Sequence, residues 1–177
     1  MTHCVALLRG INVGTAKRIA MADLRELIED LGHSEVRTLL NSGNAVFKAK
    51  GSDPGKMAQS ISKAVEKKFG FGVAVVVVTA TDLAAILKEN PLAKKAKDPA
   101  RYLVAFVSGR AELESAKPLL ERTWAPEEIA LGKHAAYLWC ADGIHSSKLW
   151  QAFTRATKDG ATARNWSTVL KLQAMLG

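Results

Sequence analysis

Three short polar segments interrupt an otherwise apolar sequence, and each carries side chains that can bind an anion. The first is Leu-Leu-Arg-Gly-Ile-Asn-Val-Gly at 7–14, the second is Asn-Ser-Gly-Asn at 41–44, and the third is Thr-Ala-Arg-Asn-Trp at 162–166. Arginine presents a planar fork of donors that fits phosphate or carboxylate, whereas asparagine and serine donate hydrogen bonds without charge. These residue types predict a ligand that carries negative charge.

The predicted ligand-binding residues come from all three segments and from the residues that follow them. Arg9 and Arg164 would bind phosphate, while Lys17 and Lys171 would add positive charge. Glycines at 10 and 14 let the backbone approach a ligand closely, and a helix that starts after this loop would add its positive dipole end. The uncharged residues expected to complete the site are Asn12, Asn41, Ser42, Asn44 and Asn165.

None of the three segments contains His, Cys, Asp or Glu. Metal sites and acid–base catalysts are built from those residues, so neither is predicted in these segments. The glycine spacing at 10–14 also differs from a dinucleotide-binding fingerprint. We therefore expect no cofactor and no metal.

Composition and charge narrow the class of partner. The chain has 177 residues, of which 48% are hydrophobic and 24% charged, and its net charge is +8. The positive balance favours an anionic small molecule or nucleic acid as partner. No apolar run is long enough to span a bilayer, and residues 1–8 lack the basic start of a signal peptide. Cys4 and Cys140 lie in apolar runs and read as reduced core residues, which predicts a cytoplasmic protein; the oligomeric state stays open.

Hydrophobic periodicity predicts an α+β protein made of two ferredoxin-like (split βαβ) halves in tandem, with extra C-terminal helices. The N-terminal half covers 1–80, a linking helix and basic loop cover 81–100, and a C-terminal half that ends in two helices covers 101–177. The strands expected in the first half are His3–Leu8, Glu35–Asn41, Asn44–Lys48 and Val73–Thr79. Helices are expected around 21–31 and from the Asp53-Pro54 cap to Phe69.

The second half repeats this order of elements. We expect strands at 101–107, 128–131 and 135–140, and helices at 112–122 and 147–157; Pro118 must either kink the first of these helices or delay its start. A last helix over 163–176, capped by Thr162, is expected where a fourth strand would stand. The two halves show no residue-level repeat, so a duplication rests on element order alone.

The ferredoxin-like topology also predicts where the first two polar segments lie. A parallel crossover makes the first two strands run the same way, so the loop after the first strand and the turn after the second lie at one sheet edge. The third strand pairs with the first, which brings loop and turn together. We expect the segment at 162–166 to join them, so that all three form one basic cleft.

Each of these features also has a purely structural interpretation. Glycine and asparagine are ordinary turn residues, Arg164 can form a salt bridge, and Trp166 can be a core side chain. Two alternatives to anion binding therefore remain open. One is an enzyme acting on a phosphorylated small molecule, with Ser42 or a lysine as nucleophile; the other is a structural or partner-binding module.

The same segments resemble domain of unknown function 1697, a family of uncharacterised bacterial proteins, and the resemblance extends over nearly the whole chain. It implies an α+β fold of two similar halves and supplies no established activity. The residues that carry it are 6–14, Met21, Leu24, 36–38, 42–44, Asn90-Pro91, 147–149, 162–169 and Lys171-Leu172.

Overall fold

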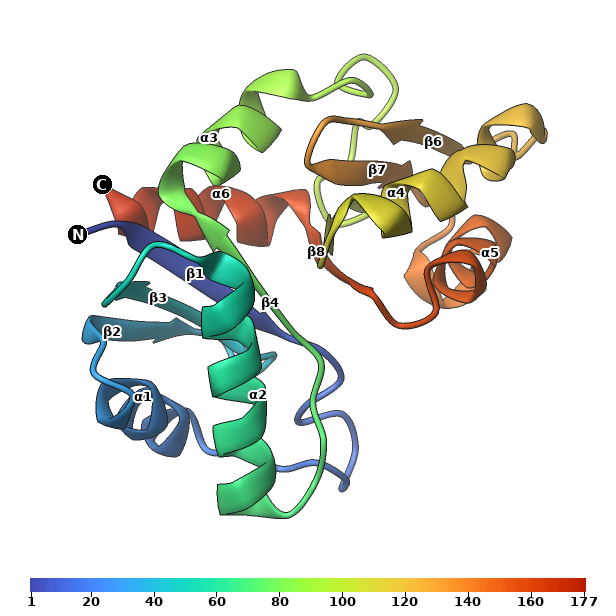
Figure 1. The fold of residues 1–177 in the computed structure, drawn as a ribbon. Helices are drawn as coiled ribbons and strands as arrows, with labels where there is room; N and C mark the ends of the chain where they lie inside the picture. The colour runs from blue at the N-terminus through green and yellow to red at the C-terminus, as the bar shows by residue number, and fades with distance from the viewer. The chain divides into compact units, whose positions relative to one another are not determined.

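The computed structural model describes all residues, Met1–Gly177, and they form two compact units. The first unit comprises Met1–Thr81 with Ala174–Gly177, and the second comprises Asp82–Gln173. Each unit contains a four-stranded antiparallel sheet with helices packed on it (Figure 1). The protein is therefore α+β, and its two halves share the split βαβ order of elements that the sequence predicts.

In the first unit the strand order is β2-β3-β1-β4, and every neighbouring pair is antiparallel. Helices α1 and α2 cover one face of this sheet (Figure 1), where the small and apolar side chains of β1 and β3 form the core with them. The elements of this unit are β1 (His3–Leu8), α1 (Met21–Asp30), β2 (Ser34–Leu39), β3 (Asn44–Lys48), α2 (Pro54–Phe69) and β4 (Val75–Thr79).

Local signals set the ends of α2 as the sequence predicts. The Asp53 carboxylate accepts a hydrogen bond from the Lys56 backbone N–H at 3.2 Å, and Pro54 occupies the first helical turn. Gly70 ends the helix with a φ of 80°, a left-handed conformation that glycine adopts without steric cost. Between these ends Met57, Ile61 and Val65 face the core at helical spacing.

In the second unit the strand order is β6-β7-β5-β8, again with antiparallel neighbours. With β5 counted as first strand, this is the order found in the first unit. Pro118 ends α4 early, and a short 3₁₀ helix follows at Lys117–Glu121. The elements are α3 (Ala80–Glu89), whose first two residues belong to the first unit, β5 (Tyr102–Val107), α4 (Arg110–Ala116), β6 (Glu128–Leu131), β7 (Ala135–Trp139), α5 (Lys148–Thr157), β8 (Ala161–Asn165) and α6 (Trp166–Leu176).

The last helix predicted from the sequence starts too early. Residues 161–165 form the strand β8, paired with β5 from Val107↔Ala161 to Leu103↔Asn165, so the fourth strand is present and lies between the two final helices. Thr162 is therefore no helix cap. Asn165 has that role, because its Oδ1 accepts the Thr168 N–H at 2.9 Å. Alanine and arginine favour helices in isolation, and pairing with β5 overrides that preference.

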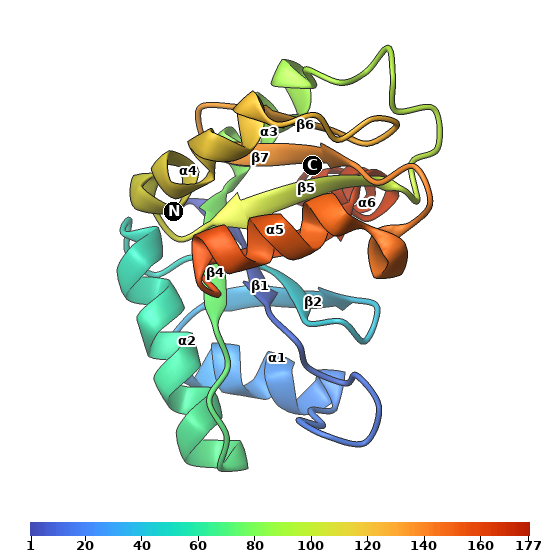
Figure 2. The same ribbon diagram turned by 90° about the vertical axis from the view of Figure 1, so that its right-hand side faces the viewer.

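Helices cover both faces of the second sheet. On one face α4 and α5 pack against Leu103 and Ala105 of β5 (Figure 2). On the other face Tyr102 stacks on Trp166 of α6 with ring centroids 4.9 Å apart. Also on that face, the Tyr137 hydroxyl donates a hydrogen bond to the Ile86 carbonyl of α3 at 2.7 Å. Helix α3, which the sequence predicts to be a linking helix, therefore packs against the sheet of the second unit.

No helix is both long and apolar enough to cross a membrane.

Both cysteine thiols are expected to be unreactive in the folded protein. Cys4 and Cys140 are fully buried, and burial raises the pKa of the Cys140 thiol to about 11. Because the thiolate is the nucleophile, we expect reaction with Ellman's reagent at pH 8 to be at least about a hundredfold slower than for a free thiol. Both thiols should react rapidly once guanidinium has unfolded the protein, whereas rapid modification of the native protein would contradict the buried positions.

Candidate functional site

The connection between β1 and α1 is the longest loop of the first unit. It spans residues 9–20, whereas the equivalent connection between β5 and α4 in the second unit consists only of Ser108 and Gly109. Figure 2 shows the first of these loops as a wide excursion between the end of β1 and the start of α1. Long ordered loops on a regular scaffold are usually functional, so this loop is the leading candidate for a binding element.

Asn12 holds this loop in shape. Its Oδ1 accepts the Ile19 N–H at 2.8 Å, and its Nδ2 donates to the Ile19 carbonyl at 2.8 Å and to the Asn41 carbonyl at 2.7 Å. The Asn12 backbone has a φ of 54°, a left-handed conformation that asparagine tolerates better than most residues. One side chain therefore closes the loop on itself and ties it to the β2–β3 turn.

The end of β1 also meets the β2–β3 turn through the backbone, because the Leu8 N–H donates to the Gly43 carbonyl at 2.8 Å. The Arg9 N–H donates to the Ala74 carbonyl, in the connection between α2 and β4, at 3.0 Å. A Cβ placed on Gly43 would lie 2.8 Å from Leu8 Cβ and 2.9 Å from Ile11 Cδ1. The predicted proximity of the first two polar segments is thus confirmed, and it depends on glycine at 43.

The turn itself is longer than the sequence predicts. The predicted strand reaches Asn41, but β2 ends at Leu39, because Leu40 has a φ of 58° and cannot continue a strand. Four residues, 40–43, therefore connect Leu39 to its partner Asn44. Asn44 is fully buried, and its Nδ2 donates to the Leu39 carbonyl at 3.0 Å and to Ser42 Oγ at 2.9 Å.

These contacts separate the roles of the polar residues at this edge. Asn44 is closed off from solvent and shapes the turn, whereas Asn41 and Ser42 are exposed. Ser42 Oγ accepts a hydrogen bond from the Asn44 amide. An amide takes up no proton, so Asn44 cannot act as a general base for the Ser42 hydroxyl. Exposed polar groups from the turn therefore lie beside the loop, while Asn12 and Asn44 serve mainly to hold that surface together.

The charged side chains of the loop are all basic. Arg9 is half-buried, and Lys17 and Arg18 are exposed; Arg18 Nη1 donates to the Gly14 carbonyl at 3.1 Å. The Lys17 carbonyl accepts the Asn12 N–H at 3.0 Å, so the backbone of the basic stretch is fixed to the same asparagine. No aspartate or glutamate occurs in 9–20 or 40–44. The positive charge of this edge is therefore not offset within its own segments.

Three of the predicted ligand-binding residues belong to the second unit. Arg164 lies on β8 opposite Val104, and its Nη1 donates to Thr162 Oγ1 at 2.9 Å and to the Ala163 carbonyl at 2.8 Å. Burial lowers the pKa of Arg164 to about 10, which still leaves it charged at neutral pH. Asn165 caps α6, and Lys171 is exposed on that helix.

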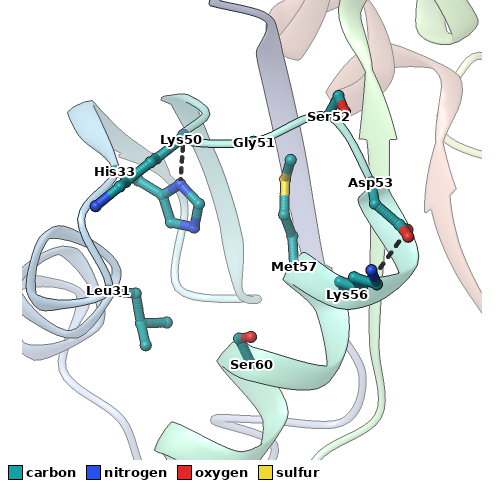
Figure 3. A pocket seen from close by; sticks show the side chains of 9 residues that line it. All are labelled: Leu31, His33, Lys50, Gly51, Ser52, Asp53, Lys56, Met57 and Ser60. Carbon is teal, nitrogen blue, oxygen red and sulfur yellow. Dashed lines mark hydrogen bonds between the residues drawn. The ribbon is translucent and has the colours of Figure 1, made fainter.

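Sequence reasoning missed a pocket at the other end of the first sheet. It has a volume of about 370 Å³ and lies between the start of β2, the end of β3 and the first turns of α2 (Figure 3). Its lining residues are Leu31, His33, Lys50, Gly51, Ser52, Asp53, Lys56, Met57 and Ser60. These residues are spread over 31–60 and form no motif in the sequence. His33 and Lys50 are brought together only by the antiparallel pairing of β2 with β3.

No group of three or more His, Cys, Asp or Glu side chains is arranged to hold a metal ion.

The fold and the candidate site define an α+β protein whose two units share the same strand order and whose first unit carries a long basic loop. The chain belongs to the family described as "Protein of unknown function (DUF1697)", whose model matches residues 1–137. This match confirms the family resemblance and covers the first two polar segments, while the third, at 162–166, lies beyond the residues matched. A comparison with curated proteins gives no match.

A solved structure supports the fold along the full length of the chain. The conserved bacterial protein SP0830 from Streptococcus pneumoniae is similar with a TM-score of 0.81, at 24% sequence identity, and the alignment covers 99% of each chain. At that identity the likeness extends to the fold alone. Any functional conclusion therefore depends on the residues of this chain.

Proposed function

We propose that the first unit binds an anionic, phosphate-bearing ligand, either nucleotide-like or nucleic acid, at the edge formed by loop 9–20 and turn 40–43. The observation that carries the proposal is the fixation of a basic loop to a polar turn by Asn12. A loop held in one conformation has less entropy to lose on binding than a mobile one. Arg9, Lys17 and Arg18 would supply the charge, and Asn41 and Ser42 would supply uncharged donors.

Two exposed apolar side chains favour a ligand that has an apolar face as well as phosphate. Val13 is 72% exposed and Leu40 is 55% exposed, and each is adjacent in sequence to one of the bonded pair Asn12 and Asn41. A nucleobase or a short single strand offers such a face next to its phosphates. We also propose that each unit is a ferredoxin-like half, which the shared strand order supports.

The test measures binding of a fluorescein-labelled single-stranded DNA 20-mer and, separately, of ATP. Affinity for the oligonucleotide should fall steeply with salt, because binding releases condensed counterions. The double variant Lys17→Ala/Arg18→Ala should flatten the slope of log K against log salt by roughly 0.7 for each phosphate that the variant no longer neutralises. Fluorescence anisotropy at several salt concentrations gives the slope, and calorimetry gives the ATP affinity.

Lys88→Ala is the control for a change of charge outside the site, since it removes an exposed positive charge from α3 and leaves the loop intact. It should leave both affinities close to those of the unchanged protein. Binding of both probes that is insensitive to salt, or that survives in the double variant, would overturn the proposal.

A further inference from the structure

The pocket beside α2 contains a buried side chain that presents a hydrogen-bond donor to it. His33 is only 8% exposed, and its ring lies 4.8 Å from the Phe47 ring, centroid to centroid. The His33 Nδ1 accepts the Lys50 backbone N–H at 3.0 Å (Figure 3). This bond fixes the ring at the wall of the pocket.

The same bond fixes which ring nitrogen carries the proton. A nitrogen that accepts a hydrogen bond is unprotonated, so the proton of neutral imidazole must reside on Nε2. Burial and the positive charge of Lys50 lower the pKa of His33, which keeps the ring neutral at pH 7. His33 Nε2–H is therefore a donor held in place by the fold, and Figure 3 shows that ring edge turned toward Met57 and Ser60 of α2.

The remaining lining groups are mostly donors or cations. Ser52 and Ser60 bring hydroxyl groups, and Lys56 brings an ammonium group. The Lys50 side chain runs away from the pocket (Figure 3), and its Nζ lies 3.7 Å from where a Cβ on Gly32 would stand. The one acidic side chain, Asp53, already accepts the Lys56 N–H as the cap of α2. The pocket walls therefore carry more hydrogen-bond donors than free acceptors, and Lys50 adds positive charge from the far side of His33.

Part of the pocket wall is apolar. Met57 is buried at its base, and Leu31 lies beside His33 at the end of α1 (Figure 3). A volume of about 370 Å³ is at the lower end of the range for small-molecule sites, and it exceeds what a bare phosphate needs. A ligand with a charged head and a small organic group matches these walls better than an inorganic ion does.

We infer that this pocket is a second binding site, distinct from the loop edge, for a small phosphate ester. The phosphate accepts hydrogen bonds from His33 Nε2–H and from the serine hydroxyls, and Lys56 offsets its charge. The organic group packs on Met57 and Leu31. The site lies at the opposite end of the first sheet from turn 40–43, so it does not depend on the function proposed for the loop.

Two variants of His33 separate ligand binding from structural support. His33→Asn places an amide oxygen near the former Nδ1, which keeps an acceptor for the Lys50 N–H and removes the donor at Nε2. His33→Gln places an amide nitrogen near the former Nε2, which keeps the donor and removes that acceptor. A purely structural histidine would be replaced better by Asn, whereas a ligand-binding one would be replaced better by Gln.

The experiment follows backbone amide shifts in the full-length protein by ¹H–¹⁵N NMR during titration with phenyl phosphate. Phenol and sodium chloride at matched ionic strength are the control titrants. We expect saturable shifts at His33, Ser52, Gly55 and Lys56. His33→Asn should weaken binding about tenfold, the effect of losing one hydrogen bond to a charged group, and His33→Gln should weaken it less.

Lys17→Ala separates this inference from the proposed function, since it should change phenyl phosphate shifts only in loop 9–20 and leave those at His33, Ser52, Gly55 and Lys56 unchanged. Ser60→Ala replaces an exposed hydroxyl and should weaken binding severalfold without disturbing the fold, which keeps the test decisive if a His33 variant fails to fold. Shifts that rise without saturation, that spread over surface lysines, or that persist unchanged in both His33→Asn and Ser60→Ala would overturn the inference.

Discussion

Replacing Gly43 with alanine is expected to lower the free energy of unfolding of the first unit by about 2–5 kcal/mol. Two costs combine. The residue has a φ of 86°, which an L side chain rarely adopts, and the new methyl group would lie 2.8 Å from Leu8 Cβ and 2.9 Å from Ile11 Cδ1. Leu8 and Ile11 are fully or nearly fully buried, so neither can move aside without disturbing the core.

Gly14→Ala is the matched control for this prediction. Gly14 has a φ of 63°, but a Cβ placed on it would have no heavy atom within 4 Å. It should therefore show only the conformational cost, about 1–2 kcal/mol. Equal losses for Gly14→Ala and Gly43→Ala would show that the close approach of the loop to the turn does not constrain residue 43.

Urea unfolding followed by two probes can assign the loss to one unit. All four tryptophans, Trp124, Trp139, Trp150 and Trp166, lie in the second unit, so their fluorescence reports on that unit. Far-UV circular dichroism reports on both. Gly43→Ala should move part of the dichroism transition to lower urea and shift the fluorescence transition less.

Asn12→Asp is expected to release the loop from the turn at neutral pH and to weaken ligand binding at this edge. The replacement has the same shape, but it exchanges the Nδ2 donor for an oxygen that faces the Ile19 and Asn41 carbonyls at 2.8 and 2.7 Å. Two hydrogen bonds are lost and like partial charges are opposed. We expect a loss of about 2–4 kcal/mol in the stability of the loop.

Amide hydrogen exchange across 9–20 measures this effect directly, with exchange across α2 as the internal reference. Loop amides should exchange faster in Asn12→Asp, and acid should reduce the difference, because a protonated carboxyl regains a donor. Asn41→Ala is the control, since its backbone carbonyl still accepts the bond from Asn12. Unchanged exchange in Asn12→Asp would show that Asn12 does not hold the loop.

Local signals in the sequence were sufficient where a residue acts on its own neighbours. Asp53 caps α2, and Pro54 occupies its first turn, as their types and positions predict. Pro118 interrupts the helix predicted at 112–122, although α4 ends before it at Ala116 rather than continuing with a kink. Local signals failed where pairing with a distant strand decides the conformation. Ala163 and its neighbours form β8 because β5 is beside them. Leu40 leaves the predicted strand with a φ of 58°, a conformation that leucine rarely adopts and that its residue type does not indicate.

The candidate site was predictable in position but not in detail. Topology alone placed the loop after β1 beside the turn after β2, and the Leu8–Gly43 bond confirms that placement. The sequence could not show that Asn44 would be buried or that Asn12 would use its amide on the backbone. It also gave no sign of the pocket, because His33 and Lys50 are joined only by strand pairing.

Because both units have the same strand order, the second unit shows how many residues this fold needs between its first strand and its first helix. The second unit passes from first strand to first helix through two residues, Ser108 and Gly109, whereas the first unit uses residues 9–20 for the same step. The additional residues of loop 9–20 are not needed to form the sheet, because the second unit forms a sheet of the same strand order with a connection of two residues. A chimera that carries the short link in place of 9–20 would therefore separate what the architecture needs from what this one copy has acquired in addition.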